Sequence, residues 1–452
     1  MVELRLTQVL SEPSGLRWDS EFFRKPILAA KASIEGKPHD SLGNLTPRIQ
    51  HPVEIERTYS EAGLRILLAQ EVRDNQLVLG EGSFMPPSVR PLIAANRLER
   101  DDVLLTRSGA NFGQCAPMKT DDEIFACADL LIVRKGRLPG GYLSTLLNTR
   151  QGRLLLDRGA YGMAQPHIAP TYVRTLPVPL FEELAKIVDR TVEDAESEKS
   201  LAISHLTQAE QTFLKELGLA DWAPPEALTW HRRAKDVLTA ARWDAEYFAP
   251  RVQQLIKKLS APGVTVGSVA PLRKKYFTPV SGKPFDYIEI SNVTQYGEAN
   301  STRLDGGEAP SRATWHVRKG DIITSTVRPI RRLTALIQPE QDNFVCSSGF
   351  AVLQPKTVPS ELLLVYLRLP VICELMDLHT TASMYPAISV PNILALPFVK
   401  PSDKGREKIV SQVQSARAAR RRAHELLERA KRAVEIAIED SEAAALKYLK
   451  GS

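Results

Sequence analysis

Residues Phe181 to Leu219 read FEELAKIVDRTVEDAESEKSLAISHLTQAEQTFLKELGL and contain neither proline nor glycine before Gly218. Small or apolar residues recur in this stretch at the three-and-four spacing of a single helical stripe. They are Leu184, Val188, Thr191, Ala195, Ala202, Leu206, Ala209, Phe213 and Leu217. The stretch therefore predicts one continuous helix, roughly 55 Å long at about 1.5 Å per residue. A helix of that length, charged on its other faces, needs a partner to cover its stripe.

A second stretch, from about Lys404 to Lys450, repeats the pattern. Its stripe is formed by Ile409, Val413, Ala416, Ala423, Leu427, Ala430, Val434 and Ile438. Because alanines along both stripes allow two helices to approach closely, we predict that the two stretches pack as an antiparallel coiled-coil pair. The alternative is two unrelated surface helices, each lying on its own domain.

The composition is that of an ordinary globular protein. At 452 residues the chain is too long for one core and predicts two or three domains. It has no long apolar run and no basic-then-apolar signal segment at its start, so we expect a cytoplasmic protein that does not span a membrane. The four cysteines show no metal-site spacing, so we expect buried, reduced thiols and no zinc. The net charge of +6 permits a polyanionic partner without requiring one.

The chain also repeats itself. Arg17-Trp18-Asp19-Ser20-Glu21-Phe22-Phe23 is matched by Arg242-Trp243-Asp244-Ala245-Glu246-Tyr247-Phe248. Five further matches follow in the same order at a nearly constant shift. They are Ile66 to Val72 with Tyr287 to Val293, Asp102 to Ser108 with Asp321 to Val327, Phe125 to Cys127 with Phe344 to Cys346, Met163 to Pro170 with Met384 to Pro391, and Ala209 with Ala430. Matches in one order indicate a tandem duplication, in which each half is a globular unit followed by a long helix.

Within each unit we expect short strands bounded by turns, with helices near the end. Asp102 to Thr106 and Asp321 to Thr324 are rich in β-forming residues. Tyr142 to Asp157 and Ser360 to Leu378 have helical periodicity, with Ser360 as a helix N-cap.

We therefore predict an α+β fold: two tandem globular domains separated by an antiparallel pair of long helices, with an internal pseudo-twofold duplication. The predicted boundaries are 1–180 for the first domain, 181–219 for the first long helix, 220–241 for a crossover linker, 242–401 for the second domain and 402–452 for the second long helix.

A search for catalytic motifs finds none that fits. The sequence has no GxxxxGK[ST] phosphate loop, no strand followed by GxGxxG and no HExxH metal motif. It also lacks the Asn/Asp-Pro-Pro-Tyr/Phe motif of amino-methyltransferases. His167 and His379, near the ends of the two units, are better interpreted as surface or hydrogen-bonding residues. We therefore expect no catalytic site, no metal site and no cofactor bound by this chain.

Basic and hydroxyl side chains instead gather where strands end. Thr106 to Asn111 closes a strand of the first unit, where arginine and asparagine can reach base edges or phosphates, and Thr324 to Arg332 is the equivalent stretch of the second unit. The candidate DNA-binding residues are Thr106, Arg107, Ser108, Asn111, Arg150, Arg153, Arg158, Lys274, Lys275, Thr326, Arg328, Arg331 and Arg332. Taken singly, each of these residues can equally be a solvated loop residue.

In the order of its parts, the chain resembles the specificity (S) subunits of type I restriction-modification systems. The stretch DVLLTRSGANFG (102–113) is similar to the strand-then-Arg-Ser-Gly loop of that family, and GMAQPHIAPTYVRTLPVPL (162–180) is similar to its Gln-Pro-x-Ile segment. The two Arg-Trp-Asp openings and Ala209-Glu210 add to a likeness that spans nearly the whole chain. The second unit departs from it, because Thr326-Val327-Arg328 replaces Arg-Ser-Gly and Met384-Tyr385-Pro386 replaces Met163-Ala164-Gln165-Pro166. The position of its base-reading loop is therefore left open.

The resemblance implies a non-catalytic, DNA-binding subunit of a phage-defence complex. Each domain would be a target-recognition domain that reads one half of a bipartite target in double-stranded DNA, and the long helices would set the distance between the halves. Two methyltransferase (M) subunits are implied as partners, with restriction/translocase (R) subunits in a complete restriction complex. S-adenosylmethionine, ATP and magnesium are expected on those partners. The apolar and small helix residues not used in pairing are candidates for the docking surface.

Two other classes of function stay open at this point. A duplicated adaptor or scaffold would bind protein through its two units, and it would be indifferent to the loss of loop arginines. A self-contained nuclease would cleave DNA when given magnesium.

Overall fold

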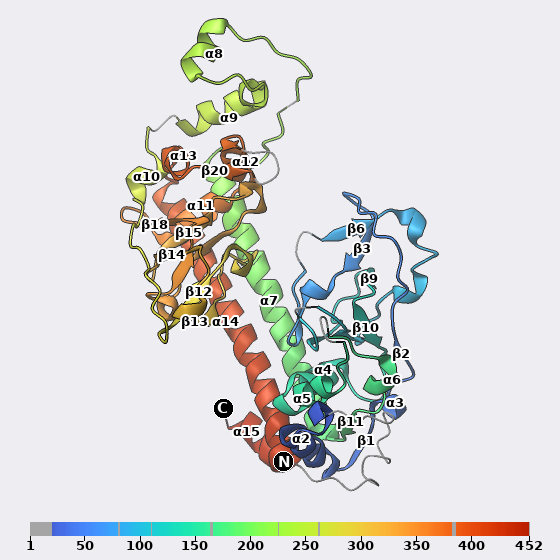
Figure 1. Cartoon of the computed structure of the whole chain (residues 1–452). Helices are drawn as coiled ribbons and strands as arrows, with labels where there is room; N and C mark the ends of the chain where they lie inside the picture. Colours follow the sequence, from blue (N-terminus) through green and yellow to red (C-terminus); the bar gives the residue numbers. More distant parts are fainter. Residues whose placement is uncertain are drawn as a thin grey trace. The chain divides into compact units, whose positions relative to one another are not determined.

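A computed structural model of the chain describes residues 20–79, 82–109, 111–162, 166–224, 226–260, 263–381 and 386–451. The chain forms two compact units (Figure 1): unit 1 is Met1–Ser200 with Arg420–Ser452, and unit 2 is Leu201–Ala419. Parts of two sequence matches, at positions 17–19 of the first and at 163–165 and 384–385 of the match between 163–170 and 384–391, lie outside the described residues.

Unit 1 is built on short strands. These are β1 His39–Ser41, β2 Ile49–Gln50, β3 Leu64–Leu67, β4 Val72–Arg73, β5 Gln76–Leu77, β6 Ser83–Met85, β7 Val103–Thr106, β8 Cys115–Pro117, β9 Ile124–Ala126, β10 Leu130–Val133 and β11 Pro177–Pro179. One sheet has the order β2-β10-β7-β8 and a second has the order β6-β3-β9, while β1 pairs with β11 and β4 with β5. β7 and β10 are buried along their whole length, which fits their unbroken apolar sequences VLLT and LLIV.

The helices of the globular part of unit 1 are α2 Lys25–Glu35, α3 Leu42–Leu45, α4 Gly140–Asn148, α5 Arg150–Arg158 and α6 Pro170–Val173. The sequence predicted α4 and α5 as one helix. The predicted helix over 142–157 is interrupted at Thr149, whose hydroxyl accepts a hydrogen bond from the Gly152 N–H at 3.0 Å and so caps the start of α5. A threonine that can bond to the backbone favours a helix start over a helix interior.

Unit 2 has a similar content. Its strands are β12 Pro284–Ile288, β13 Thr302–Asp305, β14 Ala313–His316, β15 Ile322–Ser325, β16 Thr334–Leu336, β17 Val345–Ser347, β18 Phe350–Leu353, β19 Thr380–Thr381 and β20 Ala387–Ile388. They form sheets in the orders β13-β12-β17-β14 and β16-β15-β18, with β19 paired to β20. Its helices are α8 Ala234–Ala240, α9 Pro250–Ser260, α10 Val266–Val269, α11 Ser360–Arg368, α12 Pro370–Asp377 and α13 Val390–Ala395.

The helix predicted over 360–378 is also two helices, because Pro370 cannot continue α11. The predicted N-cap at Ser360 was wrong. Pro359 holds the cap position, and Ser360 is the first helical residue, whose hydroxyl donates to the Gly320 carbonyl at 2.7 Å.

The two units share a common core of strand pairings, which confirms the predicted duplication. β7 lies between antiparallel β10 and β8, and β15 lies between antiparallel β18 and β16. The parallel pair of β3 with β9 in unit 1 corresponds to the parallel pair of β12 with β17 in unit 2. A buried tyrosine repeats in detail: the Tyr142 hydroxyl donates to Pro179 at 2.9 Å, and the Tyr366 hydroxyl donates to Pro397 at 2.5 Å.

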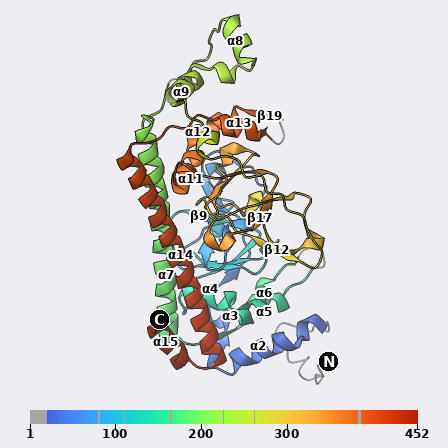
Figure 2. The same ribbon diagram turned by 90° about the vertical axis from the view of Figure 1, so that its left-hand side faces the viewer.

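The long helices, α7 Glu182–Glu216 and α14 Asp403–Glu439, contribute to both units and lie side by side (Figures 1 and 2). In unit 1 their buried seam consists of Val192, Ala195, Ala423 and Leu427. In unit 2 it consists of Ala202, Ala416 and Ala419, followed by Ala209, Phe213, Ile409 and Val413 within the main core. Residue numbers that rise along α7 fall along α14, so the pair is antiparallel, as predicted.

The second long helix ends earlier than position 450. α14 stops at Glu439, and a separate helix, α15 (Glu442–Lys450), begins after Ser441, whose hydroxyl accepts from the Ala444 N–H at 3.2 Å. The break lets the Glu442 carboxylate accept a hydrogen bond from the Leu184 N–H at 2.9 Å, in the first turn of α7. A carboxylate there satisfies a free backbone donor and the positive end of the helix dipole.

Two expectations from composition can be compared with the fold. All four cysteines are buried and unpaired, and burial raises the pKa of the Cys115 thiol to about 12. Among the described residues, no helix combines the length and the apolar composition needed to cross a membrane.

The alanine seam generates a stability prediction. Ala416 and Ala202 pack in the same cluster and are 1% and 0% exposed. The larger side chain of Ala416→Leu would force the two helices apart. It should lower the free energy of unfolding of unit 2 by about 1–3 kcal/mol. Ser411→Leu, at an exposed position of the same helix, is the matched control. Chemical denaturation of both variants checks this, and equal midpoints for the two would show that the seam is not tightly packed.

Candidate nucleic-acid interface

The loop that follows β7 is closed by its own backbone. We call residues 107–113 the first strand-end loop. The Gly113 N–H donates to the Thr106 carbonyl at 2.9 Å, and the Phe112 N–H donates to the Gly109 carbonyl at 3.1 Å. Gly109 and Gly113 have φ angles of +88° and +78°, which residues with a Cβ rarely adopt. The two glycines therefore permit the turn that carries the half-buried Arg107 and Asn111.

Asp129 anchors this loop from the turn before β10. Its backbone carbonyl accepts from the Arg107 N–H at 2.8 Å, and its carboxylate accepts from the Ser108 hydroxyl at 3.1 Å. Arg57 pairs with the same carboxylate at 2.6 Å. Burial opposes ionisation of Asp129, but the hydrogen bond and charge of Arg57, the hydrogen bond of Ser108 and the charge of Arg107 together lower its pKa. The ionised Asp129 thus holds Arg57 next to the loop.

A third segment lies against the loop. Ser108 forms a β-bridge with His167, which in turn pairs with Tyr161. The rings of Tyr161 and His167 have centroids 5.9 Å apart, and Tyr161 is 47% exposed. We call Arg57, Arg107, Asn111 and Tyr161 the first loop cluster. Two guanidinium forks, an amide and an exposed ring are the groups that bind phosphates, base edges and unstacked bases.

Sequence reasoning missed Arg57, Asp129 and Tyr161. Each lies outside the strand-end motif and belongs to no motif of its own. Only the pairing of β7 with β10 and the bridge to His167 bring them to the loop.

The loop after β15, residues 326–332, is the second strand-end loop. Three backbone contacts of the first loop recur in it. The Arg331 N–H donates to the Arg328 carbonyl, as Phe112 does to Gly109 in unit 1. The Thr326 N–H donates to the Gly349 carbonyl, as Arg107 does to Asp129. Val327 forms a β-bridge with Ala387, as Ser108 does with His167. This register places Thr326-Val327-Arg328 where unit 1 has Arg107-Ser108-Gly109. The second loop is therefore equivalent to the first in backbone register, and its role in reading bases stays a prediction.

The second strand-end loop carries different chemistry on the same backbone path. Arg331 is exposed, Thr326 and Arg328 are half-buried, and Ile330 is 54% exposed. We call these four residues the second loop cluster. Gly349 stands where unit 1 has Asp129, so the residue at that position of unit 2 has no carboxylate.

Three of the predicted DNA-binding residues are buried, and contact of their side chains with DNA stays a prediction. Thr106 is 0% exposed and Ser108 is 2% exposed, with its hydroxyl already given to Asp129. Arg158 is 5% exposed, donates from Nε to the Phe22 carbonyl at 3.0 Å, and lies 3.8 Å over the Phe22 ring. Arg158 therefore helps to build the core of unit 1.

Two more predicted arginines are held inside the protein. Arg153 of α5 pairs with Asp74 and donates to the Phe112 carbonyl at 3.3 Å. Arg332 pairs with Glu210 of α7 and donates to the Arg368 carbonyl at 2.6 Å. The two side chains are 25% and 27% exposed and already paired, and their direct contact with DNA stays a prediction.

The remaining predicted residues lie away from the loops. Arg150 is exposed at the start of α5, where its N–H donates to Glu435 of α14 at 3.2 Å. Lys274 and Lys275 are exposed, but the preceding Arg273 pairs at 2.6 Å with Asp321, at the opposite end of β15 from the loop. The structure does not gather these three residues with either loop cluster, and their binding to DNA stays a prediction.

Among the described residues, one carboxylate trio is close enough to hold a metal ion: Asp101, Asp189 and Glu193. The ammonium group of Lys119, 4% exposed, lies 2.8, 2.7 and 3.4 Å from the three carboxylates. Burial disfavours its charge, but the hydrogen bonds to Asp101 and Asp189 raise the pKa of Lys119. The trio is an internal ion-pair network that already has its cation.

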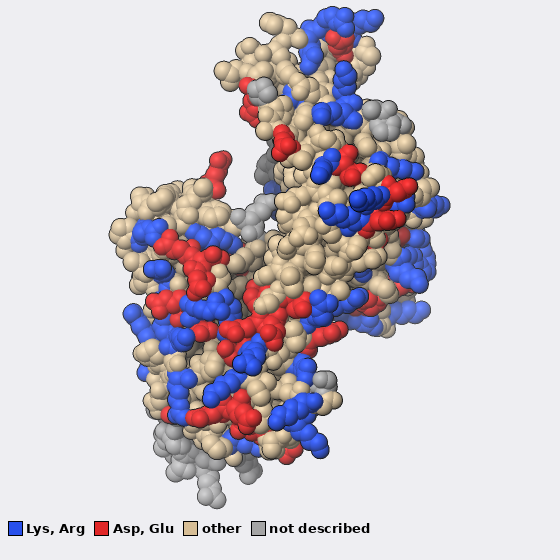
Figure 3. All heavy atoms as spheres, turned by 180° about the vertical axis from the view of Figure 1, so that it is seen from behind, with Lys and Arg blue, Asp and Glu red and all other residues tan. Residues whose placement is uncertain are grey.

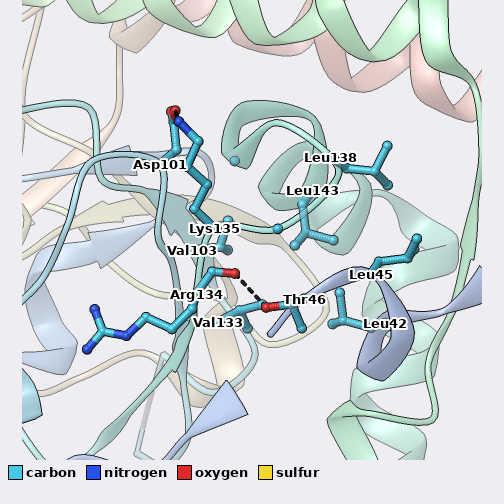
Figure 4. A pocket seen from close by; sticks show the side chains of 12 residues that line it. Leu42, Leu45, Thr46, Asp101, Val103, Val133, Arg134, Lys135, Leu138 and Leu143 are labelled. Carbon is cyan, nitrogen blue, oxygen red and sulfur yellow. Dashed lines mark hydrogen bonds and ion pairs between the residues drawn. The ribbon is translucent and has the colours of Figure 1, made fainter. Parts of the chain in front are cut away.

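A small pocket in unit 1 is lined mainly by apolar side chains such as Leu42, Leu45 and Leu143 (Figure 4). The Thr46 hydroxyl at its edge already donates to the Arg134 carbonyl at 2.5 Å. The backbone of Gly136 approaches so closely that a Cβ there would lie 2.0 Å from the Leu45 carbonyl oxygen. The ionisable side chains in its lining are already paired, Lys135 with Asp101 at 2.9 Å and Arg134 with Asp102 at 2.6 Å, so the pocket is a seam between packed elements.

Surface charge alone does not mark an interface. Basic and acidic side chains are interspersed over one face of the molecule (Figure 3). On α14, Arg422 pairs with Glu198 at 2.7 Å and Arg417 donates to Gln338, so these arginines serve the fold. The loop clusters, and not the net charge of +6, are the better guide.

No protein-family model and no curated protein matches the chain. Three solved structures are similar to it over most of its length. They are a chain from a study of complex assembly and conformational transition in the type I R-M system (16% identity, TM-score 0.28, covering 91% of this chain and 96% of that chain), the type I restriction-modification S subunit from M. genitalium (14%, 0.33, 91% and 95%) and the HsdS subunit from Thermoanaerobacter tengcongensis (15%, 0.28, 92% and 97%). Because the three TM-scores lie below 0.5, the function is argued from the residues described above.

The reassignment of Arg158 can be tested by stability. Arg158→Ala removes a backbone hydrogen bond and the guanidinium packed on Phe22, and it should lower the free energy of unfolding by about 2–3 kcal/mol. Arg150→Ala, at an exposed position of the same helix, should leave the melting temperature unchanged. Thermal and chemical denaturation compare the two variants. A stable Arg158→Ala protein with impaired DNA binding would restore Arg158 as a ligand.

Proposed function

We propose that this chain is a DNA-specificity subunit that reads a bipartite target in double-stranded DNA, one half through each loop cluster. The observation that carries the proposal is the pair of strand-end loops with one backbone path and different side chains. A duplicated scaffold with unlike side chains at equivalent positions suits the reading of two unlike half-sites. The order of motifs, which resembles that of type I specificity subunits, supports the same conclusion.

The chemistry of each cluster suggests how a half-site would be read. Arg107, Arg328 and Arg331 can each hold guanine through two hydrogen bonds or neutralise a phosphate. Asn111 suits the edge of adenine, and the exposed Ile330 suits the methyl group of thymine. Asp129 keeps Arg57 in place beside the first loop, where it can add a phosphate contact.

We further propose that the long helix pair sets the spacing between the half-sites. A rigid element is needed, because two clusters on a flexible linker would accept many spacings. α7 contains 35 residues, which corresponds to about 52 Å of helix at 1.5 Å per residue. Half-sites on one face of DNA lie about 34–36 Å apart, one duplex turn, which is within the length of such a helix.

The chemistry of modification would belong to partner subunits. We propose two methyltransferase subunits that bind S-adenosylmethionine and flip the target base, with ATP- and magnesium-dependent translocase subunits in a complete restriction complex. On α7, Leu201 is 49% exposed and Ile203 is 44% exposed. The two residues flank the buried Ala202, about 100° from it on either side of the helix, and exposed apolar residues beside the helix seam suit the docking of a partner protein.

The docking role of α7 is testable by charge insertion. Leu201→Asp combined with Ile203→Asp should abolish copurification with the methyltransferase subunit, because two carboxylates would be buried without partners in the interface. Leu92→Asp, at a position of unit 1 that is 63% exposed, is the control and should assemble normally. Circular dichroism checks that helicity is retained. Unimpaired assembly of the double variant would exclude these two positions from the docking site.

The reading of two half-sites predicts that loop variants fail on one half only. Wild-type complex with its methyltransferase subunits should enrich a split motif from a pool of random duplex DNA. Arg107→Ala should relax base preference by roughly tenfold or more in one half, and Arg328→Ala with Arg331→Ala should do so in the other half. Lys257→Ala, at an exposed position of α9, should change neither half.

The other two classes of function give different results in that experiment. An adaptor would enrich no sequence, and variants of its loop arginines would behave like the wild type. A nuclease would cleave the pool when the isolated chain is given magnesium. Relaxation of both halves by a single-loop variant would also contradict the division of labour proposed here.

A further inference from the structure

Two arginines of the second strand-end loop adopt a backbone conformation that favours glycine. Arg328 and Arg332 have φ angles of +49° and +59°. In the register fixed above, they stand where unit 1 has Gly109 and Gly113, at φ +88° and +78°. A side chain in the left-handed region costs free energy unless its surroundings compensate. The side chain of Arg332 must therefore gain something that a glycine would lack.

The gain is visible in the contacts of Arg332. Its Nε donates to the Arg368 carbonyl at 2.6 Å, and its guanidinium pairs with the Glu210 carboxylate of α7. The Arg368 guanidinium in turn donates to the Arg332 carbonyl at 3.0 Å. Arg332 is thus fixed at both its backbone and its side chain, with only 27% of the side chain exposed.

Unit 1 has a guanidinium beside Gly113, the position equivalent to Arg332, but it belongs to a helix and not to the loop. Arg153 of α5 donates to the Phe112 carbonyl at 3.3 Å, beside Gly113, and pairs with Asp74. A Cβ added to Gly113 would lie 3.0 Å from Nη1 of Arg153. The guanidinium of Arg153 therefore fills the space that a side chain at position 113 would enter.

The helix of unit 2 that is equivalent to α5 has a small residue at the position of Arg153. Arg153 is the fourth residue of α5, and the fourth residue of the equivalent α12 is Cys373. Cys373 is fully buried, with its thiol 3.4 Å from the Leu367 carbonyl. Unit 1 thus combines a loop glycine with a helix arginine, and unit 2 combines a loop arginine with a small helix residue.

We propose that Arg153 and Arg332 are equivalent positioning residues: each places one guanidinium behind a strand-end loop and holds that loop in the conformation that presents its base-contacting side chains. The effect on DNA reading rests on the proposed function, whereas the effect on loop order does not. In unit 2 the anchor is tied to α7 through Glu210, and in unit 1 it is tied to Asp74, between β4 and β5.

Exchange of the residues between the patterns tests this. In unit 2, Arg332→Gly removes the guanidinium while relieving the backbone, and Arg332→Gly with Cys373→Arg installs the pattern of unit 1. In unit 1, Arg153→Cys removes the guanidinium, and Gly113→Arg with Arg153→Cys installs the pattern of unit 2. Hydrogen exchange by mass spectrometry over residues 105–115 and 324–334 reports the order of each loop without DNA.

The expected result is a tenfold or greater acceleration of exchange in the affected loop for each single variant, with substantial recovery in each double variant. Arg332→Lys keeps the charge without the planar fork and should give a partial effect in a folded protein. Double variants that exchange as fast as the single ones, or unchanged exchange in Arg332→Gly, would overturn the proposal.

The DNA readout separates positioning from general destabilisation. In the random-duplex selection, Arg332→Gly should relax base preference in the second half only, Arg153→Cys in the first half only, and each double variant should restore its half. Equal relaxation of both halves would indicate a merely structural role and overturn the positioning assignment. If the wild type selects no split motif, the proposed function fails, and the hydrogen-exchange result still decides whether the two guanidiniums are equivalent.

Discussion

The packing of α7 against α14 is the constraint on which the rest of the structure depends. Val188 and Val434 lie within the core of unit 1, and Phe213 and Val413 lie within the core of unit 2. Each core therefore contains residues of both helices. Alanine in the seam makes this possible, because two helices can approach closely only where side chains are small. The same helices thus serve as core elements of each unit and as the continuous element they share.

The sequence was a good guide wherever a pattern repeats over many residues. The helical stripes of the long helices, the apolar runs of buried strands such as β7 and the tandem matches each extend over a segment, so they predicted the architecture. Single hydrogen bonds were beyond such patterns. The capping hydroxyl of Thr149 divides one predicted helix in two, and Ser441 ends the second long helix early.

Site residues were harder to predict because one side-chain type serves opposite purposes. Arg107 and Arg158 were both predicted from sequence to bind DNA. Arg107 is half-buried at a loop, whereas Arg158 is buried with its guanidinium over the Phe22 ring. Arginine suits both roles, since its planar fork binds carbonyls, carboxylates and rings as readily as it binds DNA. Arg57 could not be selected at all, because its position beside the first loop depends on Asp129 and on the register of β7 with β10. Burial and partner, rather than residue type, separate the candidates.

The most direct test of the central claim is the sequencing of methylated adenines in DNA from cells that express this chain with its methyltransferase subunits, compared with cells that lack the chain. The account predicts one split motif, made of two short defined halves with a fixed gap, and its disappearance without the chain. Methylation at a contiguous motif, or methylation unchanged by loss of the chain, would contradict the claim that two loop clusters on one helix pair choose the target.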